Sequence, residues 1–112
     1  QRYADHLVLP VWKPLADPAW FAFTLTVREN APFTRRDLND YLHDHKVQTR
    51  YLFAGNILQQ PGCHNIPHRV ATSLTQTIRV LKNALFIGVY PGMSEAHLAY
   101  MLEVFENFFR QY

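Results

Sequence analysis

The stretch "WFAFTLTV", residues 20–27, is where the chain most clearly alternates between two kinds of side chain. One set is strongly apolar and consists of Phe21, Phe23, Leu25 and Val27. The intervening positions are Trp20, Ala22, Thr24 and Thr26. Aromatic and β-branched residues favour strands, and a period of two places each set on its own face of a sheet. We therefore predict a strand here, with different residues on its two faces.

Residues 47–53 and 85–90 are the other strand candidates. The first, "VQTRYLF", is short and is followed by a loop of Gly, Asn, Gln and Pro residues, an arrangement that often forms one wall of a binding site. The second, "LFIGVY", is a continuous apolar run, typical of a strand that is covered on at least one face. Pro91 and Gly92 end this second strand.

Three helices are predicted around these strands. Thr34 can cap the first, with Asp37 three residues later in a pattern related to the capping box. The second begins at His68 and has mostly helical spacing, and the third follows Ser94 with apolar residues every three or four positions. This order predicts an α+β fold: a three-stranded, mainly antiparallel sheet with helices packed on one face.

Residues 1–19 are predicted to form an extended lead-in to this unit. Pro10, Pro14 and Pro18 lie at four-residue spacing, which excludes a helix and favours an extended connector. The chain also begins without Met, and we expect it to be cut from a longer protein. The folded domain would then consist of residues 20–112.

Composition and charge exclude several classes of partner. The 112 residues can bury roughly two-thirds of their unfolded surface, and 48% of them are hydrophobic, which argues against disorder. A net charge of +2 gives no sign of a nucleic-acid partner, and no apolar run is long enough to cross a membrane. The single cysteine, Cys63, excludes an internal disulfide and fits a reducing compartment, so we expect a cytoplasmic protein.

Arg50 is the first candidate for a binding residue. It lies in the strand candidate 47–53 beside apolar neighbours, where a guanidinium needs a partner. That partner is either a carboxylate of the domain itself or an anionic ligand such as a phosphate. Asn56, Gln59 and Gln60 add donors and acceptors suited to a hydroxyl-rich ligand, although such residues are equally common in turns.

Sequence motifs identify neither a catalytic residue nor a metal site in this chain. The chain has no GxGxxG, GxxxxGK[ST] or GxSxG pattern, and we assign no catalytic residue to it. Cys63, His64 and His68 are possible zinc ligands by type, but their spacing is not one of the usual ones and a fourth ligand is not evident. We therefore interpret them as loop residues and predict no metal site.

Three stretches together resemble a known family: "DPAWFAFTLTV", "TRRDLNDYLHDHKVQTRYLFAGNILQQP" and "FIGVYPGMSEAHLAYMLEVFENFF". They are similar to the C-terminal small domain of the DegT/DnrJ/EryC1/StrS aminotransferase family, and most of all to its CDP-4-keto-6-deoxyglucose 3-dehydrase branch. The resemblance covers nearly the whole chain from about Leu7. It implies the small domain of a fold-type I enzyme that uses pyridoxal or pyridoxamine phosphate (PLP or PMP).

The resemblance also implies that two domains of the parent protein have different roles. A large domain, absent here, would bind the cofactor and carry the catalytic residue, while this domain closes over a sugar nucleotide, and the parent would be a homodimer. The implied substrate-side residues of this chain are Arg50, Asn56, Phe21 and Arg79. The dehydrase branch also uses an iron–sulfur cluster held by several cysteines, which Cys63 alone cannot provide, so no cofactor is expected in this fragment.

The resemblance leaves three functions open. The first is a sugar-nucleotide 3-dehydrase of lipopolysaccharide O-antigen (dideoxysugar) synthesis, and the second is a PLP-dependent sugar-nucleotide aminotransferase of the same family. The third, from another class, is a freestanding α+β module that binds a small metabolite. The stretch "SLTQT", residues 73–77, departs from the more acidic sequence of relatives and leaves the sugar unassigned.

Overall fold

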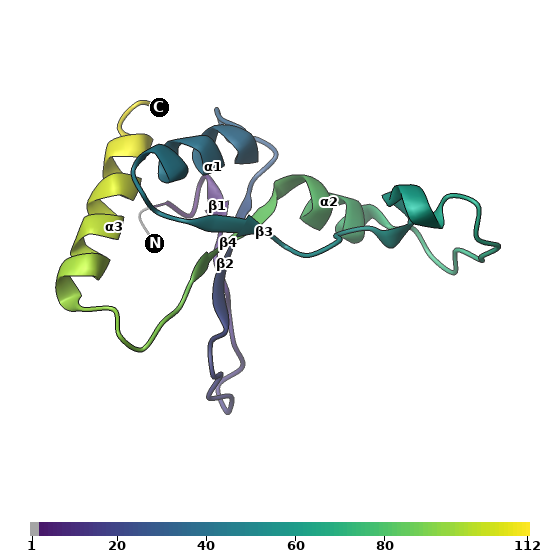
Figure 1. Cartoon of the computed structure of the whole chain (residues 1–112), viewed down its shortest axis with the longest axis horizontal. Helices are drawn as coiled ribbons and strands as arrows, with labels where there is room; N and C mark the ends of the chain where they lie inside the picture. The colour runs from purple at the N-terminus through teal and green to yellow at the C-terminus, as the bar shows by residue number, and fades with distance from the viewer. Residues whose placement is uncertain (1–2) are drawn as a thin grey trace.

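The computed structural model describes residues 3–112, which form one four-stranded sheet and three α-helices (Figure 1). The strands are β1 (Leu7–Val8), β2 (Ala22–Val27), β3 (Thr49–Tyr51) and β4 (Ala84–Gly88). The helices are α1 (Arg35–Asp44), α2 (Thr75–Asn83) and α3 (Glu95–Phe109). In space the strands follow the order β1-β2-β4-β3, and all neighbours are antiparallel. The predicted α+β class is confirmed.

The predicted number of strands is wrong, because β1 was not anticipated. Leu7 pairs with Val27 and Val8 with Thr26, so part of the proline-rich lead-in joins the sheet edge. Leu7 is buried in the core. A strand of two residues shows no alternation, and the prolines that follow it pointed only to an extended connector.

The register of the sheet sorts residues onto two faces. Leu25 lies opposite Leu85, and Phe23 lies opposite Ile87. Because side chains alternate along a strand, these residues share one face, and the intervening Phe86 lies on the other. The alternation predicted for residues 20–27 is confirmed over Ala22–Val27, where Leu25 and Val27 are buried. The predicted face of Phe21 is wrong, because Phe21 precedes β2 and its ring contacts Phe86 on the other face.

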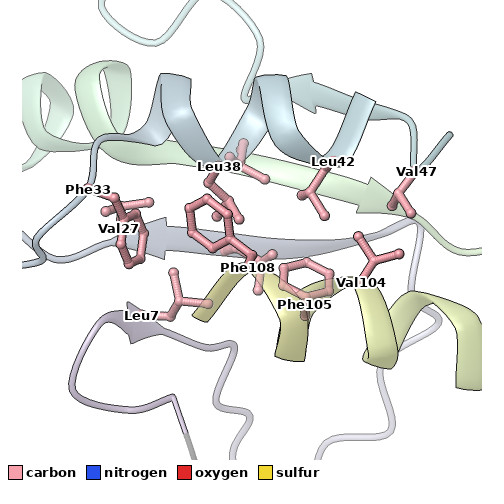
Figure 2. Packing of buried hydrophobic residues seen from close by; sticks show 11 residues of the cluster. Leu7, Val27, Phe33, Leu38, Leu42, Val47, Val104, Phe105 and Phe108 are labelled. Carbon is pink, nitrogen blue, oxygen red and sulfur yellow. The ribbon is translucent and has the colours of Figure 1, made fainter. Parts of the chain in front are cut away.

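Helices α1 and α3 cover the apolar face, here called the covered face. Leu38 and Leu42 of α1 are fully buried, and Figure 2 shows them meeting the aromatic side chains of α3 above β2 and β4. The ring of Phe108 lies 4.9 Å from that of Phe33 in an edge-to-face arrangement. Phe105 and Phe108 thus belong to the core. Helix α2 extends away from the start of β4 rather than lying on this face (Figure 1), so the one-face expectation holds for two helices.

The predicted second helix is too long at its start. Only Thr75–Asn83 is helical, and the preceding residues 53–74, here called the arm, contain two 3₁₀ turns at Ile57–Gln59 and Pro61–Cys63. Pro67 and the Thr72–Ser73 pair disfavour helix because proline lacks an N–H and small hydroxyl side chains compete for backbone groups. The strands also end earlier than predicted, at Tyr51 and Gly88.

Arg35 joins α1 to the end of α2. Its Nη1 donates to the carbonyl oxygen of Leu81 at 2.6 Å and to that of Ala84 at 3.3 Å. The guanidinium also lies over the ring of Tyr51 in β3, 3.8 Å from its centroid. A cation at the last carbonyls of a helix suits the helix dipole, so Arg35 fixes α2 to the sheet.

Gly55 allows the start of the arm to lie against α2. Its φ is +60°, and a Cβ at this position would lie 2.5 Å from Cδ1 and 3.0 Å from Cα of Leu81. The backbone atom cannot move aside as a side chain can. Only glycine therefore permits this close approach.

Replacing Gly55 with alanine is expected to lower the free energy of unfolding by about 1–3 kcal/mol, because the methyl group meets Leu81 and the backbone favours glycine. Denaturant unfolding measures the change. Gly62→Ala is the matched control, since a Cβ there meets nothing within 4 Å. Equal stability of the two variants would contradict the packing of the arm on α2.

The capping box at the start of α1 predicts a pH dependence. The carboxylate of Asp37 accepts hydrogen bonds from N and Oγ1 of Thr34, both at 2.8 Å, and these lower the pKa of Asp37. A lowered pKa in the folded state stabilises the protein above the unfolded pKa, and this stabilisation is lost as the pH falls through the folded pKa. Asp37→Asn should therefore lower the melting temperature at pH 7, and the difference from the parent should close in acid. A difference independent of pH would contradict this role of the carboxylate.

Candidate functional site

The second face of the sheet, here called the open face, carries Arg50 on its edge strand β3. Arg50 lies opposite Phe86 in the register of β3 and β4, and Phe86 lies opposite Thr24 of β2. The arginine is exposed, and among residues 3–112 its side chain forms no hydrogen bond or ion pair. The internal ion pair considered from the sequence is therefore not found within the described chain, and the guanidinium remains available to an anion.

An aromatic row lies beside this arginine and consists of Phe21, Phe86 and Phe53. The ring of Phe86 lies 6.3 Å from that of Phe21 at an interplanar angle of 53°, and 6.3 Å from that of Phe53 at 48°. The two outer residues, Phe21 and Phe53, are 77% and 78% exposed. Such exposure leaves a large apolar area in water, and exposed apolar patches commonly mark binding surfaces.

The sequence identified only one member of this row. Phe21 was a candidate, whereas Phe86 lay within the continuous run "LFIGVY", in which no alternation shows which side chains face outward. Phe53 lay at the predicted end of a strand. A signal was present in Arg50, the middle residue of β3, because its partner in the register had to share its face.

Phe53 has an unusual backbone. Its φ is +45°, in the left-handed region that bulky residues seldom adopt. The chain turns at this residue from β3 into the arm, and Gly55 then brings the arm against Leu81. The turn holds an exposed phenylalanine ring over Phe86, so an unfavourable local conformation supports a surface that is not buried by the domain itself.

Asn56 lies in the arm rather than on the strands of the open face. It is buried, and its Oδ1 accepts a hydrogen bond from the backbone N of Leu58 at 3.1 Å, which caps the first 3₁₀ turn. It also lines a hollow of about 320 Å³ between the arm and the start of α2. The hydrogen bond to the side-chain oxygen of Asn56 thus stabilises the loop after β3.

Arg79 lies in α2, and its Nε is buried without a hydrogen-bond partner among residues 3–112. A buried donor without an acceptor is unfavourable, which makes Arg79 a group that gains from a partner beyond this domain. The structure therefore groups Phe21 with Arg50 on the open face, and it places Asn56 and Arg79 in the adjoining arm and helix.

The remaining candidates of the sequence lie in the arm. Nδ1 of His68 donates to the carbonyl oxygen of Ile66 at 2.8 Å, a local contact that shapes the loop. Within residues 3–112 no three His, Cys, Asp or Glu side chains are grouped so that they could share a metal ion. In the same part of the chain, no helix is both long and apolar enough to span a bilayer.

Two curated proteins are similar in sequence to nearly the whole of this chain. The lipopolysaccharide biosynthesis protein RfbH of Salmonella typhimurium is 39% identical over 109 residues, covering 97% of this chain and 25% of the relative. The dTDP-4-dehydro-2,6-dideoxy-D-glucose 3-dehydratase of Saccharopolyspora spinosa is 37% identical over 102 residues, covering 91% and 22%. The chain thus spans about a quarter of the length of these relatives.

Solved structures contain the same fold. The E. coli GDP-4-keto-6-deoxy-D-mannose-3-dehydratase with bound hydrated PLP superposes with a TM-score of 0.75, at 22% identity, over 92% of this chain and 27% of that one. The four-stranded α+β unit therefore has the same fold as part of that chain. Residues 3–106 match the family described as the DegT/DnrJ/EryC1/StrS aminotransferase family. This chain belongs to the DegT/DnrJ/EryC1/StrS aminotransferase family.

Proposed function

We propose that this chain is the small domain of a PLP- or PMP-dependent sugar-nucleotide 3-dehydrase of lipopolysaccharide O-antigen dideoxysugar synthesis. Residues 20–112 together with β1 form the domain, and the proline-rich segment of residues 1–19 connects it to a large domain. The observation that carries the proposal is the 39% identity to a lipopolysaccharide biosynthesis protein over 97% of the chain. The 3-dehydratase from Saccharopolyspora spinosa, similar over 91% of the chain, supports the same chemistry.

The shape of the chain supports a role within a larger protein. The radius of gyration is 16.2 Å, whereas a compact domain of this length has about 13 Å. The lead-in and the arm project from the sheet (Figure 1) and carry exposed apolar side chains such as Val11, Leu15 and Ile57. A freestanding module would leave these surfaces in water, so the third function considered from the sequence is disfavoured.

The residues described here do not fit the cofactor by themselves. The lysines Lys13, Lys46 and Lys82 all lie outside the strands that form the open face. When PLP or PMP is bound by the parent enzyme it supplies an electron sink for the reaction. The sulfur ligands of an iron–sulfur cluster would likewise have to come from elsewhere, because Cys63 is the only cysteine.

The contribution of this chain is to bind and orient the substrate. The guanidinium of Arg50 presents several N–H donors to an anion, and a sugar nucleotide carries a diphosphate that matches them. The aromatic row beside it excludes water from that contact, which strengthens an ionic hydrogen bond. Closure of this wall over a large domain would hold the sugar for reaction without a catalytic group from this chain.

The family description favours a second function, transfer of an amino group to the same class of keto sugar nucleotide. The two reactions are separated by testing the complete reading frame that contains this chain. The protein is supplied with PMP or PLP and glutamate, and with 4-keto-6-deoxy sugars linked to CDP, dTDP or GDP. A 3-deoxy product supports the dehydrase, an amino sugar supports the aminotransferase, and inertness towards all of these substrates contradicts both.

The substitution Arg50→Ala in the complete enzyme is expected to lower kcat/KM roughly 10- to 150-fold, because a charge-assisted contact to the substrate is lost. This fall corresponds to a loss of about 1.5–3 kcal/mol of transition-state stabilisation. The melting temperature should remain unchanged, since the Arg50 side chain makes no hydrogen bond or ion pair within residues 3–112. Steady-state kinetics and thermal unfolding measure the two quantities.

Arg36→Ala is the matched control for this experiment. Arg36 is also an exposed arginine, and it pairs with Asp40 on the surface of α1 at 3.4 Å. Its removal should leave kcat/KM unchanged. A fall in melting temperature with unchanged kinetics for Arg50→Ala would show that Arg50 pairs with another part of the protein rather than with substrate.

A further inference from the structure

We infer that Phe53 is a stacking surface for the nucleobase of the substrate, placed so that the diphosphate reaches Arg50. The inference rests on the proposed function and names the part of the sugar nucleotide that this wall recognises. It adds Phe53 and Phe86 to the residues that contact the substrate. Three observations carry it: the exposure of the ring, the conformation of its backbone and its position relative to Arg50.

The exposure of Phe53 has no explanation within the domain. Phe53 is 78% exposed, and the only ring contact of its side chain among residues 3–112 is with Phe86. A core role would require burial, which is instead the case for Phe105 and Phe108. An exposed flat ring with one edge supported by a neighbour leaves a face free for another flat group, and a nucleobase stacks on such a ring.

The backbone of Phe53 adopts an unfavourable conformation that fixes the position of its ring. The left-handed φ of +45° is unfavourable for an aromatic residue, and it is maintained while burying little apolar surface. Gly55 fixes the following loop against Leu81, and Arg35 fixes Leu81 to α1. The ring is therefore preorganised by contacts on the far side of the turn, which lowers the entropy lost when a ligand binds.

The positions of Phe53 and Arg50 match the order of the base and the diphosphate in a nucleoside diphosphate. Phe53 follows Arg50 by three residues, which places their Cα atoms at most about 10 Å apart. Phe86 fills the space between them, since it pairs with Arg50 in the register and its ring contacts that of Phe53. An aromatic surface followed by a cation along one edge of a sheet can bind a base followed by its diphosphate.

Calorimetric titration of the complete protein tests the inference without needing turnover. The ligands are CDP, dTDP and GDP, with inorganic pyrophosphate as the probe that lacks a base. Phe53→Leu should raise the Kd of the preferred nucleoside diphosphate roughly 5- to 30-fold and leave the Kd of pyrophosphate unchanged, because only stacking is lost. Phe53→Tyr should restore binding of the nucleotide, and Arg50→Ala should weaken both ligands.

Tyr90→Leu is the control for a general effect of removing an exposed ring, since Tyr90 is 70% exposed and lies beyond β4, outside the aromatic row. It should change neither Kd. The inference is overturned if Phe53→Leu binds the nucleotide as the parent does, or if it weakens pyrophosphate equally, which would make Phe53 a support for Arg50. A lowered melting temperature with unchanged Kd would also overturn it, because the ring would then pack against protein.

The stacking role of Phe53 and the proposed function can be contradicted independently. A parent protein that binds a nucleoside diphosphate but converts no sugar nucleotide would contradict the function while Phe53 could still be tested. A parent that converts a sugar nucleotide, together with a Phe53→Leu variant of unchanged nucleotide affinity, would contradict the inference alone. A parent that binds none of the three nucleotides overturns the inference directly.

Discussion

The antiparallel register of β2 against β4 is the constraint on which the other features depend. It pairs Leu25 with Leu85 on the covered face and Thr24 with Phe86 on the open face. Because side chains alternate with a period of two, a slip by one residue would expose the leucines and bury the neighbours of Arg50. The same pairing thus gives the helices their apolar surface and gives the open face its aromatic and cationic groups.

The open face and the arm are held by a small set of contacts outside the core. Arg35 binds the last carbonyls of α2, and Gly55 allows the arm to lie against Leu81. These contacts lie behind the turn at Phe53, so they hold that ring without covering it. The domain in this way combines a well-packed covered face with a surface whose apolar groups remain available to other parts of the protein or to a ligand.

The sequence predicted the elements with strong local signals and missed those fixed by tertiary contacts. The alternation before Val27 and the caps at Thr34 and Ser94 identified β2, α1 and α3, and the capping box of Thr34 with Asp37 is present. Strand β1 was missed because two residues carry no period, and its place depends on pairing with β2. The start of α2 was misplaced because apolar spacing alone does not exclude an irregular arm.

The candidate site was predicted in part for a similar reason. Arg50 stood out as a charge within an apolar strand, whereas its neighbour Phe86 becomes visible only when the register of β3 and β4 is known. The left-handed turn at Phe53 leaves no mark in the sequence, since a phenylalanine there has no preference for that conformation. Local chemistry therefore identified the cation, and the topology of the sheet supplied its surroundings.

A crystal structure of the complete protein with its sugar nucleotide would test the central claim most directly. The account predicts a diphosphate oxygen within about 2.7–2.9 Å of the Arg50 guanidinium, with the open face forming one wall of the site. A structure in which Arg50 pairs with a carboxylate of the protein, and the nucleotide binds away from the open face, would contradict it.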